Sequence, residues 1–212
     1  PNIFKPDHLN RIIGKLGDSF SGWSEQVEPC IECTPELLDE GYIRELKEMG
    51  ISRLSIGVQS FDGDELRIIK RHNDPQLIGK NYETAKKEGL HVNLDLIYGL
   101  PGQSEGSLIA SVKTAIDMKP DNICIYPLAI RRHTALEHYH RHEMADMATK
   151  YRYWDICDKL LEEAGYRCQT VVRYVNDDRS TYQQQRLEYD LWTSAFFWPI
   201  PEGDAENMLA PT

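Results

Sequence analysis

Apolar and polar residues alternate along the chain in two kinds of block. Short apolar runs end in polar or glycine-bearing turns, and between them apolar residues recur every three or four positions. This alternation with short connections is typical of βα units and a parallel sheet. The pattern predicts strands at 27–33, 53–59, 91–97 and 122–128, with a further strand at 166–174. We therefore predict an α/β fold, a (β/α) barrel with parallel strands and a ligand site at the strand C-termini.

Helix boundaries are marked by capping residues. Asp74 followed by Pro75 is typical of an N-cap and first helical position, and Gly89 is placed to end the same helix. Ser104 is placed to cap another helix, which must end before Pro120. The helical spacing of apolar residues also predicts helices that end at Gly50 and Gly165.

The composition of the chain disfavours some classes of binding partner. The chain has 212 residues, with 24 Lys and Arg against 34 Asp and Glu and a formal net charge of -10. Such a length fits one domain or most of one, and such a charge disfavours nucleic acid and anionic membranes as partners. No apolar run approaches the roughly 18 residues of a membrane span. Five scattered cysteines without a signal peptide predict reduced thiols and a cytoplasmic location.

Side-chain parity predicts a polar face on the sheet. In the third strand Asn93 and Asp95 share one face, opposite an apolar face that begins with Val92. The apolar face should pack on helices, so the polar pair should point inward, where it needs a ligand or a hydrogen-bond partner. A satisfied core carboxylate is the alternative interpretation of Asp95.

Three strand ends place polar groups at the same edge. Ser55, Gly57 and Gln59 share one face of the second strand, and Glu32 lies near the end of the first. With Asp95, Glu32 and Gln59 would suit the hydroxyls and amines of a nucleoside or amino-acid ligand. Each of them taken singly is more often a surface or capping residue.

Two loops add to this edge. The glycines of GLPGQS at 99–104 allow close backbone approach, but the loop lacks the Lys-Ser/Thr pair of a phosphate loop. Arg71 and His72 follow the first helix after Gln59, and either reaches back toward the ligand or caps a helix end.

Metal-binding patterns are weak. Cys30 and Cys33 form a C-x2-C on a predicted strand, so they should face opposite sides and lack further ligands. His138 and His142 would meet on one helical face, but no acidic or cysteine partner is fixed by the spacing. We therefore predict no metal ligand in this chain and interpret the histidine run as a solvated segment.

Several motifs resemble a known family. The chain resembles the radical S-adenosylmethionine enzymes related to oxygen-independent coproporphyrinogen III oxidase, also called coproporphyrinogen dehydrogenase, and to the haem chaperone derived from it. The resemblance covers roughly residues 1–175 and is most specific where GVQSF is combined with DLIYGLPGQ. The matching segments are IECTP at 31–35, RLSIGVQSFD at 53–62, RHN at 71–73, DLIYGLPGQS at 95–104 and IYPL at 125–128.

The resemblance implies a partial TIM-like barrel and a role for each matching position. Glu32 would bind the ribose of S-adenosylmethionine. Gln59, Arg71 and Asp95 would contact S-adenosylmethionine, including a second molecule where two are bound, and Pro127 would make a further backbone contact. The implied cofactors are S-adenosylmethionine and a 4Fe-4S cluster, which the parent would use to make a 5′-deoxyadenosyl radical. Its partners would be a reductant protein and a small-molecule substrate, for which a porphyrinogen is one candidate.

The chain departs from the family pattern at both ends. The CxxxCxxC loop that would hold the cluster is not in the sequence, so we expect an N-terminally truncated barrel that cannot start a radical reaction alone. Residues 1–175 would be the core barrel. Residues 176–212, which contain LWTSAFFWPIP, are expected to be an irregular or non-native extension.

Other functions remain open. The stretch IYPLAIRRHTAL at 125–136 resembles the C-methyltransferase and cyclopropane-forming branch about as well as the oxidase branch. A haem-binding chaperone, with axial ligands from the histidine run, and an inactive remnant are the alternatives outside that enzyme class.

Overall fold

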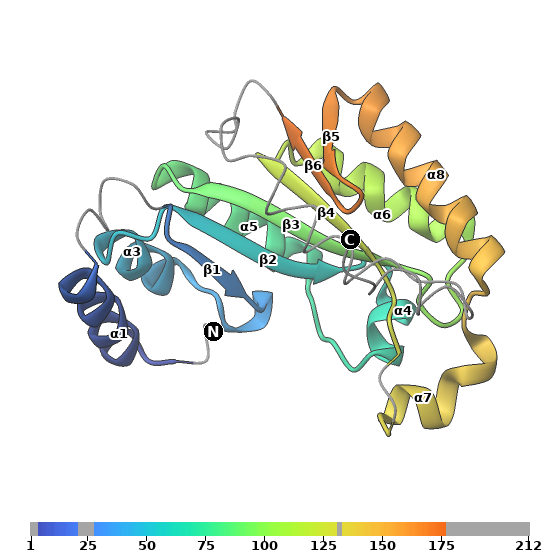
Figure 1. Cartoon of the computed structure of the whole chain (residues 1–212), viewed down its shortest axis with the longest axis horizontal. Coiled ribbons are helices and arrows are strands. Elements are labelled where there is room, and N and C mark those ends of the chain that lie inside the picture. The colour runs from blue at the N-terminus through green and yellow to red at the C-terminus, as the bar shows by residue number, and fades with distance from the viewer. Residues whose placement is uncertain (1–3, 21–27, 131–132, 177–212) are drawn as a thin grey trace, which may run out of the picture.

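The computed structural model describes residues 4–20, 28–130 and 133–176 and contains one six-stranded sheet (Figure 1). The strand order is β1-β2-β3-β4-β6-β5, and β1 to β4 are parallel to one another. The bounds are Cys30–Cys33 for β1, Arg53–Gln59 for β2, His91–Tyr98 for β3, Asn122–Pro127 for β4, Tyr166–Thr170 for β5 and Arg173–Asn176 for β6. The parallel (β/α) arrangement predicted for the first four strands is confirmed.

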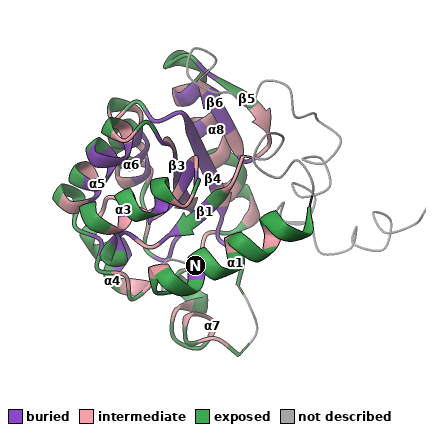
Figure 2. Ribbon diagram, turned by 90° about the vertical axis from the view of Figure 1, so that its left-hand side faces the viewer, coloured by how far each residue is buried: buried purple, intermediate pink, exposed green. Residues whose placement is uncertain are grey.

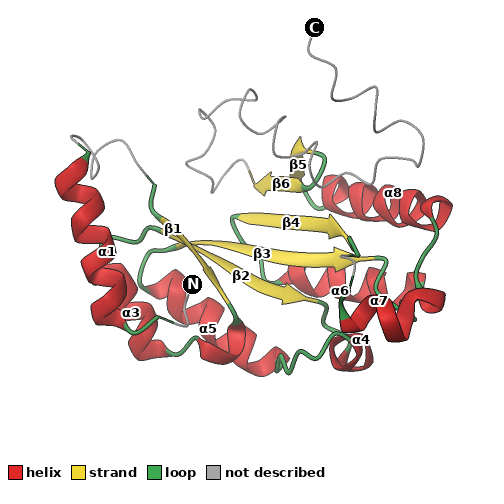
Figure 3. Ribbon diagram, turned by 60° about the horizontal axis from the view of Figure 1, so that its bottom comes forward, coloured by secondary structure: helices red, strands yellow, loops and turns green. Residues whose placement is uncertain are grey.

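Helices connect the strands and cover one face of the sheet. In Figure 3, α3, α5 and α6 lie against the same side of β1 to β4. The helices are α1 (Pro6–Ser19), α3 (Glu40–Glu48), α4 (Gly63–Ile68), α5 (Pro75–Lys87), α6 (Glu105–Asp117), α7 (Ala135–His140) and α8 (Met147–Glu163), with short 3-10 turns η1 (Pro35–Leu37) and η2 (Arg141–Glu143). No helix in the described ranges is both long and apolar enough to cross a membrane.

The predicted caps are confirmed. The Asp74 side chain accepts a hydrogen bond from the Gln76 amide, and Gly89 follows α5 with a φ of 70°. Ser104 and Ser107 form a reciprocal capping box at the start of α6. These bonds satisfy backbone donors that a helix leaves unpaired, and they fix where α5 and α6 begin.

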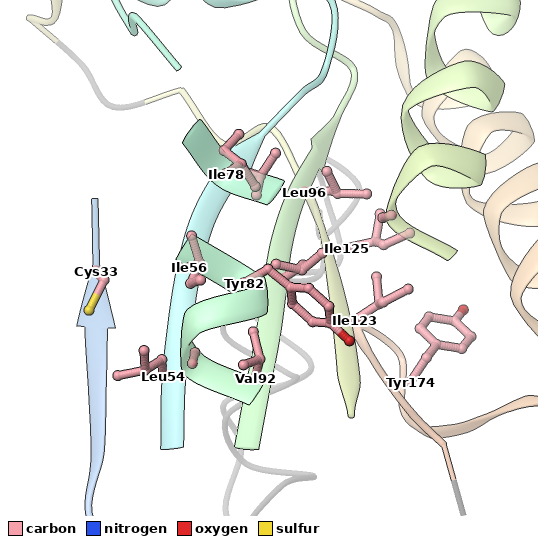
Figure 4. Packing of buried hydrophobic residues seen from close by; sticks show 14 of the residues in the cluster. Cys33, Leu54, Ile56, Ile78, Tyr82, Val92, Leu96, Ile123, Ile125 and Tyr174 are labelled. Atoms are coloured by element: carbon pink, nitrogen blue, oxygen red, sulfur yellow. The ribbon is translucent and has the colours of Figure 1, made fainter. Parts of the chain in front are cut away.

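The core lies between the sheet and these helices. Its side chains from β2 and β3 are the apolar parity set, including Leu54, Ile56, Val92 and Leu96, and they pack with Ile78 of α5 (Figure 4). Figure 2 shows the same division, with buried residues concentrated in the strands and exposed residues along α1 and α7. The parity argument is therefore confirmed, and the polar positions of each strand face away from the helix layer.

The predicted strand at 166–174 is wrong in form. It is a hairpin of β5 and β6, and β6 pairs antiparallel with β4. Hydrogen bonds from neighbouring elements stabilise the turn between β5 and β6: the Trp154 indole donates to the Val171 carbonyl, and the Ile125 amide donates to the Val172 carbonyl. No glycine, proline or asparagine marks that turn, so the apolar pattern continues through it.

Two further expectations need adjustment. The first strand begins at Cys30, since residues 28 and 29 are not in strand conformation, and residue 27 lies outside the described ranges. The extension predicted for 176–212 also lies outside them, except for Asn176, which ends β6.

Candidate functional site

Neighbouring strands bring the predicted polar residues onto one face. In the strand register, Glu32 of β1 is opposite Ser55, Gly57 of β2 is opposite Asp95, and Asp95 of β3 is opposite Cys124. Adjacent strands lie about 4.8 Å apart, so side chains of the same parity form a continuous surface. We call this surface the polar face and define it by Glu32, Ser55, Gln59, Asn93, Asp95, Cys124 and Tyr126.

Asp95 is the centre of the polar face. Its carboxylate accepts hydrogen bonds from Ser55 Oγ at 2.6 Å and from Asn93 Nδ2 at 2.7 Å. Loss of solvent raises the pKa of Asp95, these two hydrogen bonds lower it by less, and the charge of Glu32 raises it further. The effect of Glu32 on Asp95 means that the two carboxylates share one electrostatic environment. The structure thus brings Glu32 and Asp95 together as the sequence predicted.

Two donors on β4 were missed by the sequence analysis. Burial raises the pKa of the Cys124 thiol to about 12, and the charge of Asp95 contributes. Burial likewise raises the pKa of Tyr126, with further contributions from Cys124 and Asp95. Both groups are therefore protonated donors at neutral pH. The same parity that selects Asn93 and Asp95 on β3 would have found them on β4.

Gln59 ends β2 in a strained turn. Its φ is 68°, and the Ser60 amide donates to the Val58 carbonyl at 2.9 Å, the pattern of a γ-turn with positive φ. The strand pairing shifts register between Gly57 and Gln59. A Cβ on Gly57 would lie 2.7 Å from Gln59 Nε2, so the amide lies back over Gly57. The glycine therefore makes room for the amide on the polar face.

Arg71 reaches the end of the first strand. Its guanidinium donates to Thr34 Oγ1 at 3.3 Å, and Thr34 directly follows β1. The next residue, His72, is exposed, and its backbone amide donates a hydrogen bond to the Glu36 carboxylate. Arg71 thus brings a positive charge to the same edge as Glu32.

The ends of β3 and β4 complete this edge. Pro127 is the last residue of β4, is buried, and is opposite Tyr98. The loop after β3 has the unusual dihedrals predicted for it, since φ is 78° at Gly99 and 71° at Gly102. Glu32, Gln59, Arg71 and Pro127 thus lie at this end of the sheet, and Asp95 lies within β3 opposite Gly57. The roles of all five in binding stay predictions.

The residues fit one implied cofactor better than the other. The polar face offers carboxylates and an amide to hydroxyl and amino groups, and the buried Asn93 Oδ1 has no hydrogen-bond partner of its own. That donor and acceptor set suits a nucleoside carrying an amino acid.

A 4Fe-4S cluster does not fit the described residues. They contain no group of three or more His, Cys, Asp or Glu that could hold a metal ion. Cys33 is buried while Cys30 is exposed, as expected for residues on opposite faces, and burial raises the pKa of Cys33 to about 12.

The expected pairing of His138 and His142 on one helical face is wrong. Helix α7 ends at His140 and continues as the 3-10 turn η2, which changes the angular spacing. Glu143 lies 3.2 Å from His140 Nδ1 and 3.3 Å from His142 Nε2, so these histidines have a carboxylate neighbour that spacing did not reveal.

Comparison with known proteins supports the motif assignments. The profile of the Radical SAM superfamily matches residues 11–115. The chain is 30% identical to coproporphyrinogen III oxidase, anaerobic 1, of Cereibacter sphaeroides over 71% of this chain and 36% of that protein. It is 32% identical to the heme chaperone HemW of Buchnera aphidicola over 78% of this chain and 43% of that protein. The chain thus spans less than half the length of these relatives.

Solved structures agree on the fold. The structure of coproporphyrinogen III oxidase (HemN) from Escherichia coli matches with a TM-score of 0.73 and 22% identity, covering 84% of this chain and 42% of that one. The archaeal Elp3 of Methanocaldococcus infernus matches with a TM-score of 0.64 and 23% identity, covering 75% and 42%. These similarities identify the fold as that of the TIM-like barrel part of such proteins.

The raised pKa of Asp95 predicts a pH-dependent stability difference. An acid whose pKa is higher in the folded state retains its proton better in that state. The contribution of Asp95 to the free energy of unfolding therefore falls as pH rises from the ordinary pKa of 3.8 through the pKa in the folded state. Asp95→Asn should therefore become more stable than the wild-type chain as pH rises through that window, and the difference should then level off. Thermal melts between about pH 4 and 8 measure it. A variant that loses stability relative to wild type with rising pH contradicts the assignment.

Proposed function

The chain belongs to the radical S-adenosylmethionine superfamily, and on that premise we propose that its polar face binds S-adenosylmethionine in a protein resembling oxygen-independent coproporphyrinogen III oxidase. The observation that carries this proposal is the placement of Glu32 and Gln59 at the C-terminal ends of β1 and β2, with Asp95 opposite Gly57 on the adjacent parallel strand β3. Ligands of open parallel α/β sheets bind at such strand ends.

Each residue has a role that its chemistry supports. Glu32 accepts hydrogen bonds from the ribose hydroxyls, and Asp95 accepts from ligand groups through the lone pairs that Ser55 and Asn93 leave available on its two oxygens. Gln59 supplies both a donor and an acceptor from its fixed turn. Arg71 provides a positive charge for the carboxylate of the amino-acid part. Pro127 places the β4 backbone against the ligand.

Two protonated side chains of β4 add hydrogen-bond donors to the polar face. Cys124 and Tyr126 hold their protons at neutral pH because burial raises the pKa of each. They therefore act as hydrogen-bond donors toward Asp95 and its surroundings. In the whole protein, a 4Fe-4S cluster would supply the electron that cleaves S-adenosylmethionine, and no residue described here supplies its ligands.

The substrate of the whole protein is proposed by similarity. The name of the oxidase relative supports a porphyrinogen as substrate. A reductant protein is proposed as the electron source, because the cluster would need an electron for each cleavage. The heme chaperone relative supports a second candidate, in which the protein binds haem. A haem titration followed by the Soret band separates the two, because only the chaperone requires a tight haem complex.

Binding of S-adenosylmethionine by this chain is the first test. We expect a binding isotherm in calorimetry, weakened by about tenfold or more in Glu32→Gln and in Gln59→Leu, because each loses a hydrogen bond to a charged or polar ligand group. Glu48→Gln is the control, since Glu48 is exposed and belongs to α3, outside the polar face. Equal affinities in all four proteins would remove Glu32 and Gln59 from the site, and no binding by the wild-type chain would refute the proposal for this chain.

Gly57 offers a separate test of the Gln59 geometry. In Gly57→Ala the new methyl would displace the Gln59 amide, the flexible end of a side chain, so affinity for S-adenosylmethionine should fall several-fold with little change in melting temperature. Gly79→Ala is the matched control, because nothing lies within 4 Å of its Cβ position in α5. The control should keep its affinity and gain helix stability. Unchanged affinity in Gly57→Ala would show that the amide position does not matter.

A further inference from the structure

Glu65 of α4 connects the two turns that border the polar face. It is 4% exposed, and its carboxylate accepts three hydrogen bonds. Ser60 Oγ and Gln103 Nε2 donate to Oε2 at 2.6 and 3.0 Å, and Ser107 Oγ donates to Oε1 at 2.5 Å. The donors come from the turn after β2, the loop after β3 and the start of α6.

On one side this carboxylate holds the turn that contains Gln59. Ser60 directly follows Gln59, and its hydroxyl also lies 3.2 Å from Ser111 Oγ. Ser111 Oγ accepts from the Phe61 amide at 3.0 Å, so two successive residues after Gln59 are fixed by side chains. A non-glycine residue at positive φ persists only where its surroundings hold it. Here Glu65, Ser60 and Ser111 are those surroundings.

On the other side the same carboxylate holds the loop after β3. Gln103 Oε1 accepts from the Gly99 amide at 2.7 Å and from the Leu100 amide at 3.4 Å. The Gln103 carbonyl in turn accepts from the Tyr153 hydroxyl at 2.8 Å. The Gln103 amide therefore closes the Gly99 turn with its oxygen and reaches Glu65 with its nitrogen.

The charge of Glu65 suits this position. All three of its partners donate, and a carboxylate offers only acceptors when it is ionised. None of the ion pairs in the described part of the chain involves Glu65. A glutamine at this position would keep the volume but turn two N–H donors toward groups that already donate.

We propose that Glu65 is a positioning residue, which sets the Gln59 turn and the Gly99–Gly102 loop against each other and thereby fixes the polar face for its ligand. It contacts neither Gln59 nor Asp95 directly in any hydrogen bond of the described structure. The expected effect of Glu65 on ligand affinity rests on the proposed function. Its effect on the relative placement of the two turns does not require a ligand.

A purely stabilising role is the competing interpretation, and Asp121 provides the matched control. Asp121 is 2% exposed and accepts from Lys86 Nζ at 2.6 Å and from the Val92 amide at 2.7 Å. It lies at the opposite, N-terminal end of β3 and β4. Asp121→Asn should therefore lower the melting temperature as Glu65→Gln does, without reaching the polar face.

The experiment compares Glu65→Gln, Gln103→Leu and Asp121→Asn with the wild-type chain. Amide hydrogen exchange is followed in 59–62 and 99–103, and S-adenosylmethionine affinity is measured by calorimetry at a temperature where all four are folded. Glu65→Gln should accelerate exchange in both segments by about tenfold and weaken binding by a similar factor. The double variant with Gln103→Leu should lose less affinity than the product of the two single losses, because both belong to one network.

The outcomes separate the two proposals. Exchange that rises in only one segment, or equally in Asp121→Asn, overturns the positioning role of Glu65 whether or not the chain binds ligand. Wild-type affinity in a folded Glu65→Gln also overturns it. A third outcome is that the wild-type chain does not bind S-adenosylmethionine while Glu65→Gln still accelerates amide exchange in both segments. That outcome refutes the proposed function and leaves the coupling of the two turns established.

Discussion

The parallel register of β1 to β4 is the constraint on which the rest depends. Because side chains alternate along a strand, the pairing of Glu32 with Ser55 and of Gly57 with Asp95 sends both carboxylates to one face. The same pairing sends Leu54, Ile56 and their neighbours into the helix layer. A slip of one residue would exchange the two faces, burying a carboxylate among leucines. The apolar core therefore fixes the geometry of the polar face.

The polar face is costly to keep. Asp95 loses solvent beside a second acid, and Gln59 adopts a backbone conformation that non-glycine residues rarely take. Costs of this kind are typical of functional sites and persist where the surrounding structure holds them. Here the holding groups are ordinary polar side chains: Ser55 and Asn93 around Asp95, and the Glu65 network around the Gln59 turn. The stability of the fold and the proposed ligand binding thus depend on the same few hydrogen bonds.

Local patterns made much of this structure predictable. The strand at 53–59, the cap at Asp74 and the shared face of Asn93 and Asp95 follow from periodicity and capping chemistry, and the structure confirms them. Features set by tertiary contacts did not follow. The β5–β6 hairpin turns without a turn residue, and the Glu65 carboxylate joins segments more than thirty residues apart. The break of α7 at His140 likewise has no glycine or proline to announce it.

Chemical-shift mapping by NMR tests the central claim most directly. The labelled chain is titrated with S-adenosylmethionine, and amide shifts are followed along β1 to β4. We predict that the shifts concentrate at the C-terminal ends, around Cys33, Gln59, Asp95 and Leu128, and fade toward Arg53, His91 and Asn122. Shifts centred on the N-terminal ends or on the outer helices, or a saturated complex without shifts at the C-terminal ends, would contradict the account.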